Sequence, residues 1–175
     1  MSGNNSSNDL RLGFLGVVET ADAGFVGGIL VTNRLGRPLE FQCTTPVKPN
    51  RTQAILYGPT LRSFLFGELI GKTLHERLNA KPHLLLVNQE ELLSLREHVT
   101  VPVACLRAGD EQRELPDETQ LTAGRDRMSF HPDHGEDRDA AEELCRKIPA
   151  DADLCEPLDR VREALEETLG SSAAA

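Results

Sequence analysis

The sequence predicts an α/β fold, with an α+β arrangement as the alternative, and three observations support this prediction. Apolar runs of strand length alternate with segments of helical periodicity along the first hundred residues. The first three apolar runs are separated only by short polar turns, which favours an antiparallel three-strand meander at residues 10–20, 25–32 and 39–45. A chain of 175 residues is also long enough to bury one sizeable core.

The elements expected after the meander alternate between helix and strand. A stiff loop with Pro46 and Pro49 leads into a short helix, which Gly58 and Pro59 interrupt. The following elements are a longer helix, a strand, a short helix and a strand, at residues 60–78, 82–87, 89–98 and 101–106. The last strand–helix–strand segment is typical of a parallel β-α-β unit.

The charge distribution divides the chain into a nearly neutral body and an acidic C-terminal part. Residues 1–108 carry a net charge of +2 and residues 109–175 carry −11, which together give the −9 of the whole chain. The predicted division is a disordered N-terminal tail, an α/β core domain, an acidic appendage with two helices and a frayed tail, at residues 1–9, 10–108, 109–169 and 170–175.

Composition argues against several classes of partner. An acidic chain with 4% aromatic residues and no Trp is a poor general binder of nucleic acid, because it lacks both cationic surface and stacking platforms. No apolar run approaches the length of a membrane span, so no membrane partner is expected. Four cysteines without a CxxC pair, and a polar N-terminus, predict a cytoplasmic protein with free thiols.

The element order β-β-β-α-β-α-β resembles that of the ribonuclease H-like fold over residues 10–106. The resemblance implies carboxylates on the first strand, on the first helix and at the end of the fourth strand, where they would hold two metal ions. Glu19 and Glu68 are the candidate catalytic residues under this resemblance. The fourth strand, however, is followed by Asn88 and Gln89, where the resemblance implies an Asp.

Two further groups of residues are candidate sites. Arg34, Arg37, Lys48 and Arg51 lie in the turn before the third strand and in the loop after it, and they are candidates for binding an anion or a partner. The alternative is that these are two solvated turns that never meet.

A second cluster offers imidazole and carboxylate groups, which are ligands for a divalent ion: His131, Asp133 and His134. The alternative is an ordinary polar turn before a helix.

These observations favour a non-catalytic protein–protein interaction module, with a protein partner that the sequence does not identify. One alternative is a metal-dependent or degenerate nuclease-like enzyme of ribonuclease H-like architecture. A second is an anion or nucleotide sensor. No cofactor is predicted, and the His/Asp cluster keeps a divalent metal open.

Overall fold

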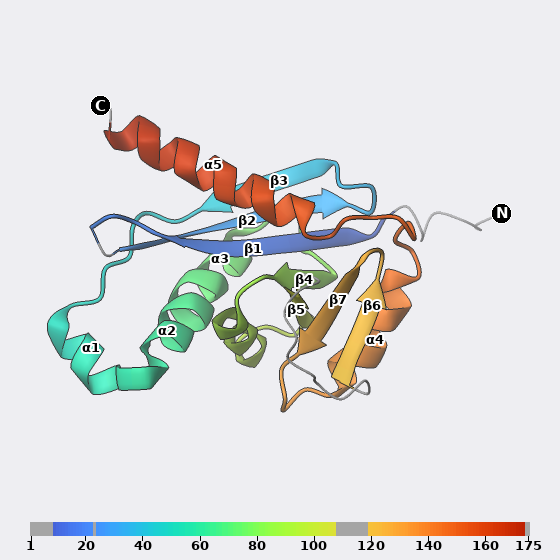
Figure 1. Cartoon of the computed structure of the whole chain (residues 1–175), viewed down its shortest axis with the longest axis horizontal. Coiled ribbons are helices and arrows are strands. Elements are labelled where there is room, and N and C mark those ends of the chain that lie inside the picture. Colours follow the sequence, from blue (N-terminus) through green and yellow to red (C-terminus); the bar gives the residue numbers. More distant parts are fainter. Residues whose placement is uncertain (1–8, 23, 108–118, 174–175) are drawn as a thin grey trace.

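The computed structural model describes residues 9–22, 24–107 and 119–173 (Figure 1). It confirms the α/β class and the expected meander followed by alternating helices and strands. One mixed sheet of seven strands, in the order β3-β2-β1-β4-β5-β7-β6, runs through these residues. The bounds of the strands are β1 Arg11–Glu19, β2 Phe25–Asn33, β3 Pro38–Cys43, β4 Leu84–Val87, β5 Val103–Arg107, β6 Gln120–Ala123 and β7 Asp126–Phe130.

The strand β1 joins the two halves of the sheet. It pairs antiparallel with β2 on one side and parallel with β4 on the other. The strands β4 and β5 are also parallel, as expected for a β-α-β unit. The strand β7 lies between β5 and β6 and pairs antiparallel with both.

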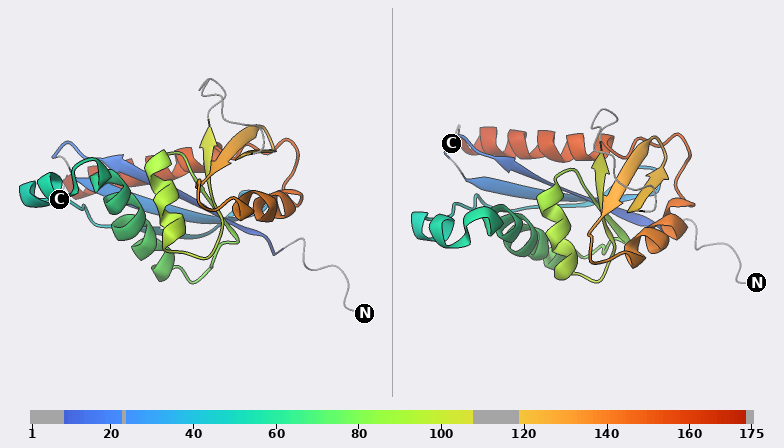
Figure 2. Two further views of the ribbon diagram at one scale, coloured as in Figure 1. Left: turned by 90° about the horizontal axis from the view of Figure 1, so that it is seen from below. Right: turned by 60° about the horizontal axis from the view of Figure 1, so that its bottom comes forward.

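Helices cover both faces of the sheet (Figures 1 and 2). One face packs on α4 and α5, and the other packs on the helical segments between β3 and β5. The bounds are α1 Arg51–Tyr57, η1 Gly58–Thr60, α2 Leu61–Ser63, η2 Phe64–Gly71, α3 Lys72–Arg77, η3 Glu90–Glu97, α4 Glu136–Cys145 and α5 Glu156–Ala173. The segment η2 is a π-helix and η3 is a 3₁₀ helix.

Alternation along β1 divides the core between the two faces. Phe14 packs into the cluster beneath α5, while Leu15 packs into the cluster beneath η2 and α3. Three α5 residues, Leu158, Val161 and Leu165, are almost fully buried in the first cluster. The strands β6 and β7 extend the same sheet. The region predicted as an acidic appendage therefore contributes directly to the core in its described part.

Two glycines permit close packing between layers. A Cβ on Gly27 of β2 would lie 2.1 Å from a methyl group of Ile70 in η2. A Cβ on Gly67 of η2 would lie 2.1 Å from the hydroxyl of Ser94 in η3. Both distances are far shorter than a van der Waals contact, so η2 approaches its two neighbours only because these positions lack side chains.

The helix α1 projects from the body (Figures 1 and 2) and buries none of its residues. Asn50 caps it in a capping box with Gln53, and Gly58 with φ of 52° ends it. Ile55 and Leu56 are 69% and 78% exposed. Among the described helices, none combines the length and the apolar character needed to cross a membrane.

Candidate functional site

The carboxyl ends of β1, β4 and β5 meet at one edge of the sheet, the edge at which open α/β sheets bind ligands. A cavity of about 730 Å³ opens there and is lined by Ser63, Asn88, Glu90 and Arg107, among others. This edge is the first candidate site.

A neutral amide joins β1 to the segment after β4 at this edge. Gln89 accepts a hydrogen bond from the Val17 amide at Oε1 (3.1 Å) and donates one from Nε2 to the Val17 carbonyl (3.2 Å). The side chain of Gln89 thus continues the pairing of β1 and β4 beyond Val87. A smaller cavity of about 230 Å³ on the α5 side of this contact is lined by Val18, Asn88, Gln89 and Arg162, among others, and no carboxylate lines it.

The carboxylates that line the larger cavity are paired with arginines. Glu90 Oε1 lies 3.1 Å from Arg107 Nη2, and Glu91 Oε1 lies 3.0 Å from Arg62 Nε. The Arg62 guanidinium also stacks over Phe66, 4.8 Å from the ring centroid. These ion pairs reduce the negative charge that a pair of metal ions would require.

The two candidate catalytic residues, Glu19 and Glu68, lie at the end of β1 and on η2, and both are exposed. Within the described residues, neither belongs to a group of three potential metal ligands. Among the residues that the structure describes, Glu19 and Glu68 do not come together in a group of three carboxylates.

The four cationic candidates fall into two pairs at opposite ends of β3. Arg34 and Arg37 flank the β2–β3 turn, whereas Lys48 and Arg51 lie beside the start of α1. A six-residue strand is about 20 Å long, so the pairs do not converge directly. Near the first pair, Arg160 Nη2 donates to the Gly36 carbonyl (3.0 Å), while the buried Arg34 Nε has no hydrogen-bond partner.

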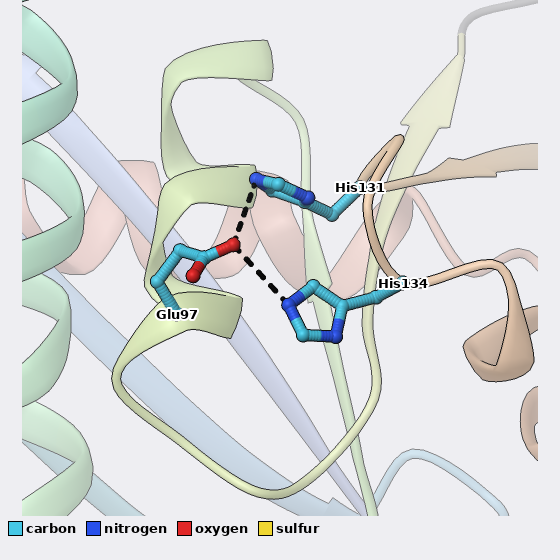
Figure 3. A group of neighbouring side chains, drawn as sticks. All are labelled: Glu97, His131 and His134. Atoms are coloured by element: carbon cyan, nitrogen blue, oxygen red, sulfur yellow. Dashed lines mark hydrogen bonds and ion pairs between the residues drawn. The ribbon is translucent and has the colours of Figure 1, made fainter.

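The histidine candidates meet a carboxylate that sequence reasoning missed. His131 and His134, in the turn between β7 and α4, both direct Nε2 at Oε1 of Glu97, the last residue of η3 (Figure 3). The distances are 3.4 Å and 3.2 Å. The backbone amide of Asp133 donates to His131 Nδ1 (3.1 Å), but the Asp133 carboxylate is not part of this group.

Two carboxylates flank the His134 ring. Its Nδ1 lies 3.1 Å from Oε1 of Glu136, on the opposite side of the ring from Glu97. The hydrogen bond to Glu136, together with the one to Glu97, raises the pKa of His134 above its ordinary value. The pKa of Glu136 is lowered by its own backbone amide and by His134.

A second group with metal-ligand atoms caps a helix. The Cys155 thiol donates to Asp126 Oδ1 (3.2 Å), and Asp153 Oδ1 accepts from the amides of Cys155 and Glu156 at the start of α5. Burial, with the hydrogen bond to Asp126, raises the pKa of Cys155 to about 12. In this arrangement Asp153 serves as a cap for the start of α5.

Comparisons with known proteins give a match at the level of structure. No protein-family model and no curated protein sequence matches the chain. Human endonuclease V is similar over 94% of this chain and 86% of that chain, with a TM-score of 0.50 and 14% identity. This chain has the fold of endonuclease V. Endonuclease V of Ciona intestinalis, in complex with DNA containing inosine, gives a TM-score of 0.46 and 11% identity over 94% of this chain and 88% of that chain.

The comparison corrects the functional predictions. The prediction of a non-catalytic protein–protein interaction module is corrected, because the structure shares its fold with human endonuclease V. The exclusion of nucleic acid as a partner is wrong as well. It was drawn from the net charge and from the scarcity of aromatic residues over the whole chain. The net charge of a chain does not describe the local charge of one face.

Groups able to hold a metal ion are present among the described residues. They do not lie on the strand ends where the resemblance implied them.

Proposed function

We propose that this chain is a nucleic-acid-binding protein of nuclease-like fold, degenerate at the edge where a nuclease of this architecture would hold its metal ions. The fold shared with human endonuclease V supports the first part. The hydrogen bonds of Gln89 to Val17 support the second, because a neutral side chain occupies the position between the ends of β1 and β4.

The distribution of charge along the chain favours a nucleic-acid surface in the segment of residues 34–81. That segment contains eight Lys or Arg residues and three Asp or Glu residues, a net charge of +5. The rest of the chain carries −14. A polyanion would therefore bind this segment and be repelled by the acidic remainder.

The helix α1 and the residues before it offer two accessible cations of that segment. Lys48 and Arg51 are exposed and have no ion-pair partner among the described residues. Cations in this state release condensed counterions when they contact phosphates, which favours binding. Arg62 lies farther along, stacked on Phe66 at the sheet edge. The proposed path for nucleic acid runs from α1 toward this edge.

The described residues at the edge offer few groups for hydrolysis. Two-metal phosphodiester cleavage needs several carboxylates to hold the two ions. Asn88 and Gln89 are neutral, and Glu90 and Glu91 are paired with arginines. Binding without efficient metal-dependent cleavage at this edge is the activity that these groups support. Four free cysteines are consistent with the cytoplasm as the proposed compartment.

The binding part is tested by fluorescence anisotropy with labelled single-stranded and double-stranded DNA and RNA over a range of salt concentrations. The Lys48→Ala/Arg51→Ala variant should bind more weakly. The plot of the logarithm of the association constant against the logarithm of salt concentration has a negative slope. Its magnitude should decrease by about 1.4 to 1.8, because two phosphate contacts are lost. The matched control is Arg125→Ala/Arg127→Ala, an exposed basic pair on the acidic part, which should leave affinity unchanged. No binding of any of the four nucleic acids at low salt would overturn the proposal.

The degenerate edge is tested by incubating the protein with the same nucleic acids and Mg²⁺ or Mn²⁺. We expect intact substrates. Cleavage that disappears in Glu68→Gln or Glu19→Gln would show that these two carboxylates form a working site after all.

A further inference from the structure

Three side chains from distant parts of the chain converge outside the sheet edge: Glu97, His131 and His134 (Figure 3), hereafter the His–Glu cluster. Glu97 ends η3, and the two histidines belong to the turn that connects β7 to α4. Their ligand atoms all lie within 4.8 Å of one another. The histidine side chains are 16% and 22% exposed, so they are partly shielded yet reachable from solvent.

Two of the three separations within the cluster match a tetrahedral site, and the third, between the two imidazole nitrogens, is at most 4.8 Å. In zinc sites His nitrogen and carboxylate oxygen lie about 2.0–2.2 Å from the metal, so two ligands of a tetrahedron are about 3.3–3.6 Å apart. Oε1 of Glu97 lies 3.4 Å from Nε2 of His131 and 3.2 Å from Nε2 of His134. Ion placement therefore requires only small movements of the side chains.

The surroundings already orient two of the ligands. Glu136 Oε1 lies 3.1 Å from His134 Nδ1, the carboxylate–histidine pairing that holds metal-bound imidazoles in the correct tautomer. A buried ion pair fixes the two backbone segments, since Arg96 Nε, beside Glu97, contacts Oδ2 of Asp137 in α4 at 2.7 Å. Asp137 is 2% exposed, and it offsets the positive charge that Arg96 brings near the cluster.

We propose that the His–Glu cluster binds one divalent transition-metal ion, with Zn²⁺ as the best match to two imidazoles and one carboxylate. The ligands are Glu97 Oε1, His131 Nε2 and His134 Nε2, and the fourth position is left for water or an external ligand. The three ligands differ from the residues of the sheet edge, although His131 lines a cavity of about 480 Å³ together with Glu90 and Arg107 of that edge. The metal proposal does not depend on the nucleic-acid proposal.

Metal binding changes the protonation of His131. In the metal-free molecule His131 Nδ1 accepts the Asp133 amide (3.1 Å), so the neutral ring carries its proton on Nε2 and points it at Glu97. A metal at Nε2 displaces that proton. The proton of the bound neutral ring then resides on Nδ1. The Asp133 amide can no longer donate to that nitrogen and donates to water instead. Asp133 is exposed, so the cost is one solvent-accessible hydrogen bond.

The test measures Zn²⁺ affinity of the full chain by competition with a chromophoric chelator, and Co²⁺ binding by visible absorption. We expect one equivalent of metal and an intense Co²⁺ spectrum of tetrahedral type without a thiolate charge-transfer band. Glu97→Gln, His131→Ala and His134→Ala should each weaken binding by at least about tenfold. Glu136→Gln should weaken it about 10–100-fold through the orientation of His134.

Three matched controls separate this site from others. His98→Ala removes an exposed imidazole next to Glu97, and Asp133→Asn removes the carboxylate nearest the turn. Cys155→Ser disables the other candidate group. All three should retain wild-type affinity. Circular dichroism of each variant checks that it is folded. Equal affinity in wild type, Glu97→Gln and His134→Ala, or loss of the site only in Cys155→Ser, would overturn the proposal.

Discussion

Single atoms decide how closely the layers of this protein pack. At Gly27 an added Cβ would lie 2.1 Å from Ile70, so the β-sheet and η2 would have to separate there. At Gly170, near the end of α5, an added Cβ would meet nothing within 4 Å. The two glycines therefore form a matched pair, one required by packing and the other dispensable.

Gly27→Ala should lower the free energy of unfolding by about 1–3 kcal/mol, because the methyl group overpacks the interface with Ile70. Gly170→Ala should be neutral or raise it by up to about 1 kcal/mol, through the helix preference of alanine. Urea denaturation of both variants measures these changes. A loss in Gly170→Ala as large as that in Gly27→Ala would contradict the packing explanation.

His83 makes stability depend on pH. Its Nδ1 accepts the Arg11 amide (3.1 Å), which requires that nitrogen to be unprotonated. Burial, with the charge of Arg11, lowers the pKa of His83 below its ordinary value. The unfolded chain therefore takes up the proton more readily, and the stabilisation present above about pH 6.5 is lost as the pH falls through the folded pKa.

His83→Asn should reduce the loss of stability between pH 7 and pH 5. The amide oxygen of Asn can still accept the hydrogen bond from the Arg11 amide, but it does not titrate. Urea midpoints of the variant and the wild type, compared between pH 7 and pH 5, measure the difference. Parallel curves for the two proteins would assign the pH dependence to other groups.

At the scale of elements, α1 is a helix stabilised mainly by the residues at its two ends. It buries no residue, so its stability depends on the Asn50 capping box, on the Gly58 terminus and on the stacking of Tyr57 on Phe64, with ring centroids 4.2 Å apart. Removal of an N-cap costs about 0.5–2 kcal/mol. Because α1 is short and has no buried residue, loss of the cap destabilises α1 alone and leaves the global free energy of unfolding unchanged.

Asn50→Ala should therefore melt α1 locally and leave the global unfolding midpoint unchanged. Amide hydrogen exchange of residues 51–57 would be accelerated, whereas exchange in β1 and β4 would stay slow. Thr52→Ala, two residues after Asn50, is the control and should leave the amides of α1 protected from exchange. A lower global midpoint in Asn50→Ala would show that α1 contributes to the core.

The sequence predicts elements better than it predicts their contacts. The meander and the β-α-β unit follow from local periodicity, and both are present. Thr52 looks like a helix cap from its type, yet Asn50 holds that position because its oxygen accepts from Gln53. Glu97 has no local pattern that would join it to His134, since the contact spans 37 residues. The neutral character of the sheet edge could be predicted in part from the sequence, because Asn88 and Gln89 follow the fourth strand directly.

The whole molecule depends on its C-terminal helix. Leu165 of α5 is fully buried against the sheet, and α5 contacts both β1 and β2. These strands belong to the part of the chain that the charge distribution had marked as a separate body. Without α5 a broad apolar face of the sheet would be open to water.

We expect a fragment of residues 1–108 to be unfolded or aggregated, as judged by circular dichroism and size-exclusion chromatography. The full chain with Leu165→Ala should remain folded but lose about 2–5 kcal/mol of stability. A monomeric fragment with a native-like spectrum would establish an independent core.

The position of β1 in the middle of the sheet also sets the order in which the chain can assemble. Its partner β2 follows at once, but the residues that meet its other edge come much later, since Val17 and Gln89 are 72 residues apart. During synthesis on the ribosome, the β1–β2 hairpin forms before its partners exist. The outer edge of β1 stays unpaired until β4 is made, and one apolar face of the hairpin stays exposed to water until α5 is made. Distant pairings of this kind are slow to form. Synthesis of this protein therefore passes through a stage that is prone to aggregation, and this stage ends when α5 packs on the sheet.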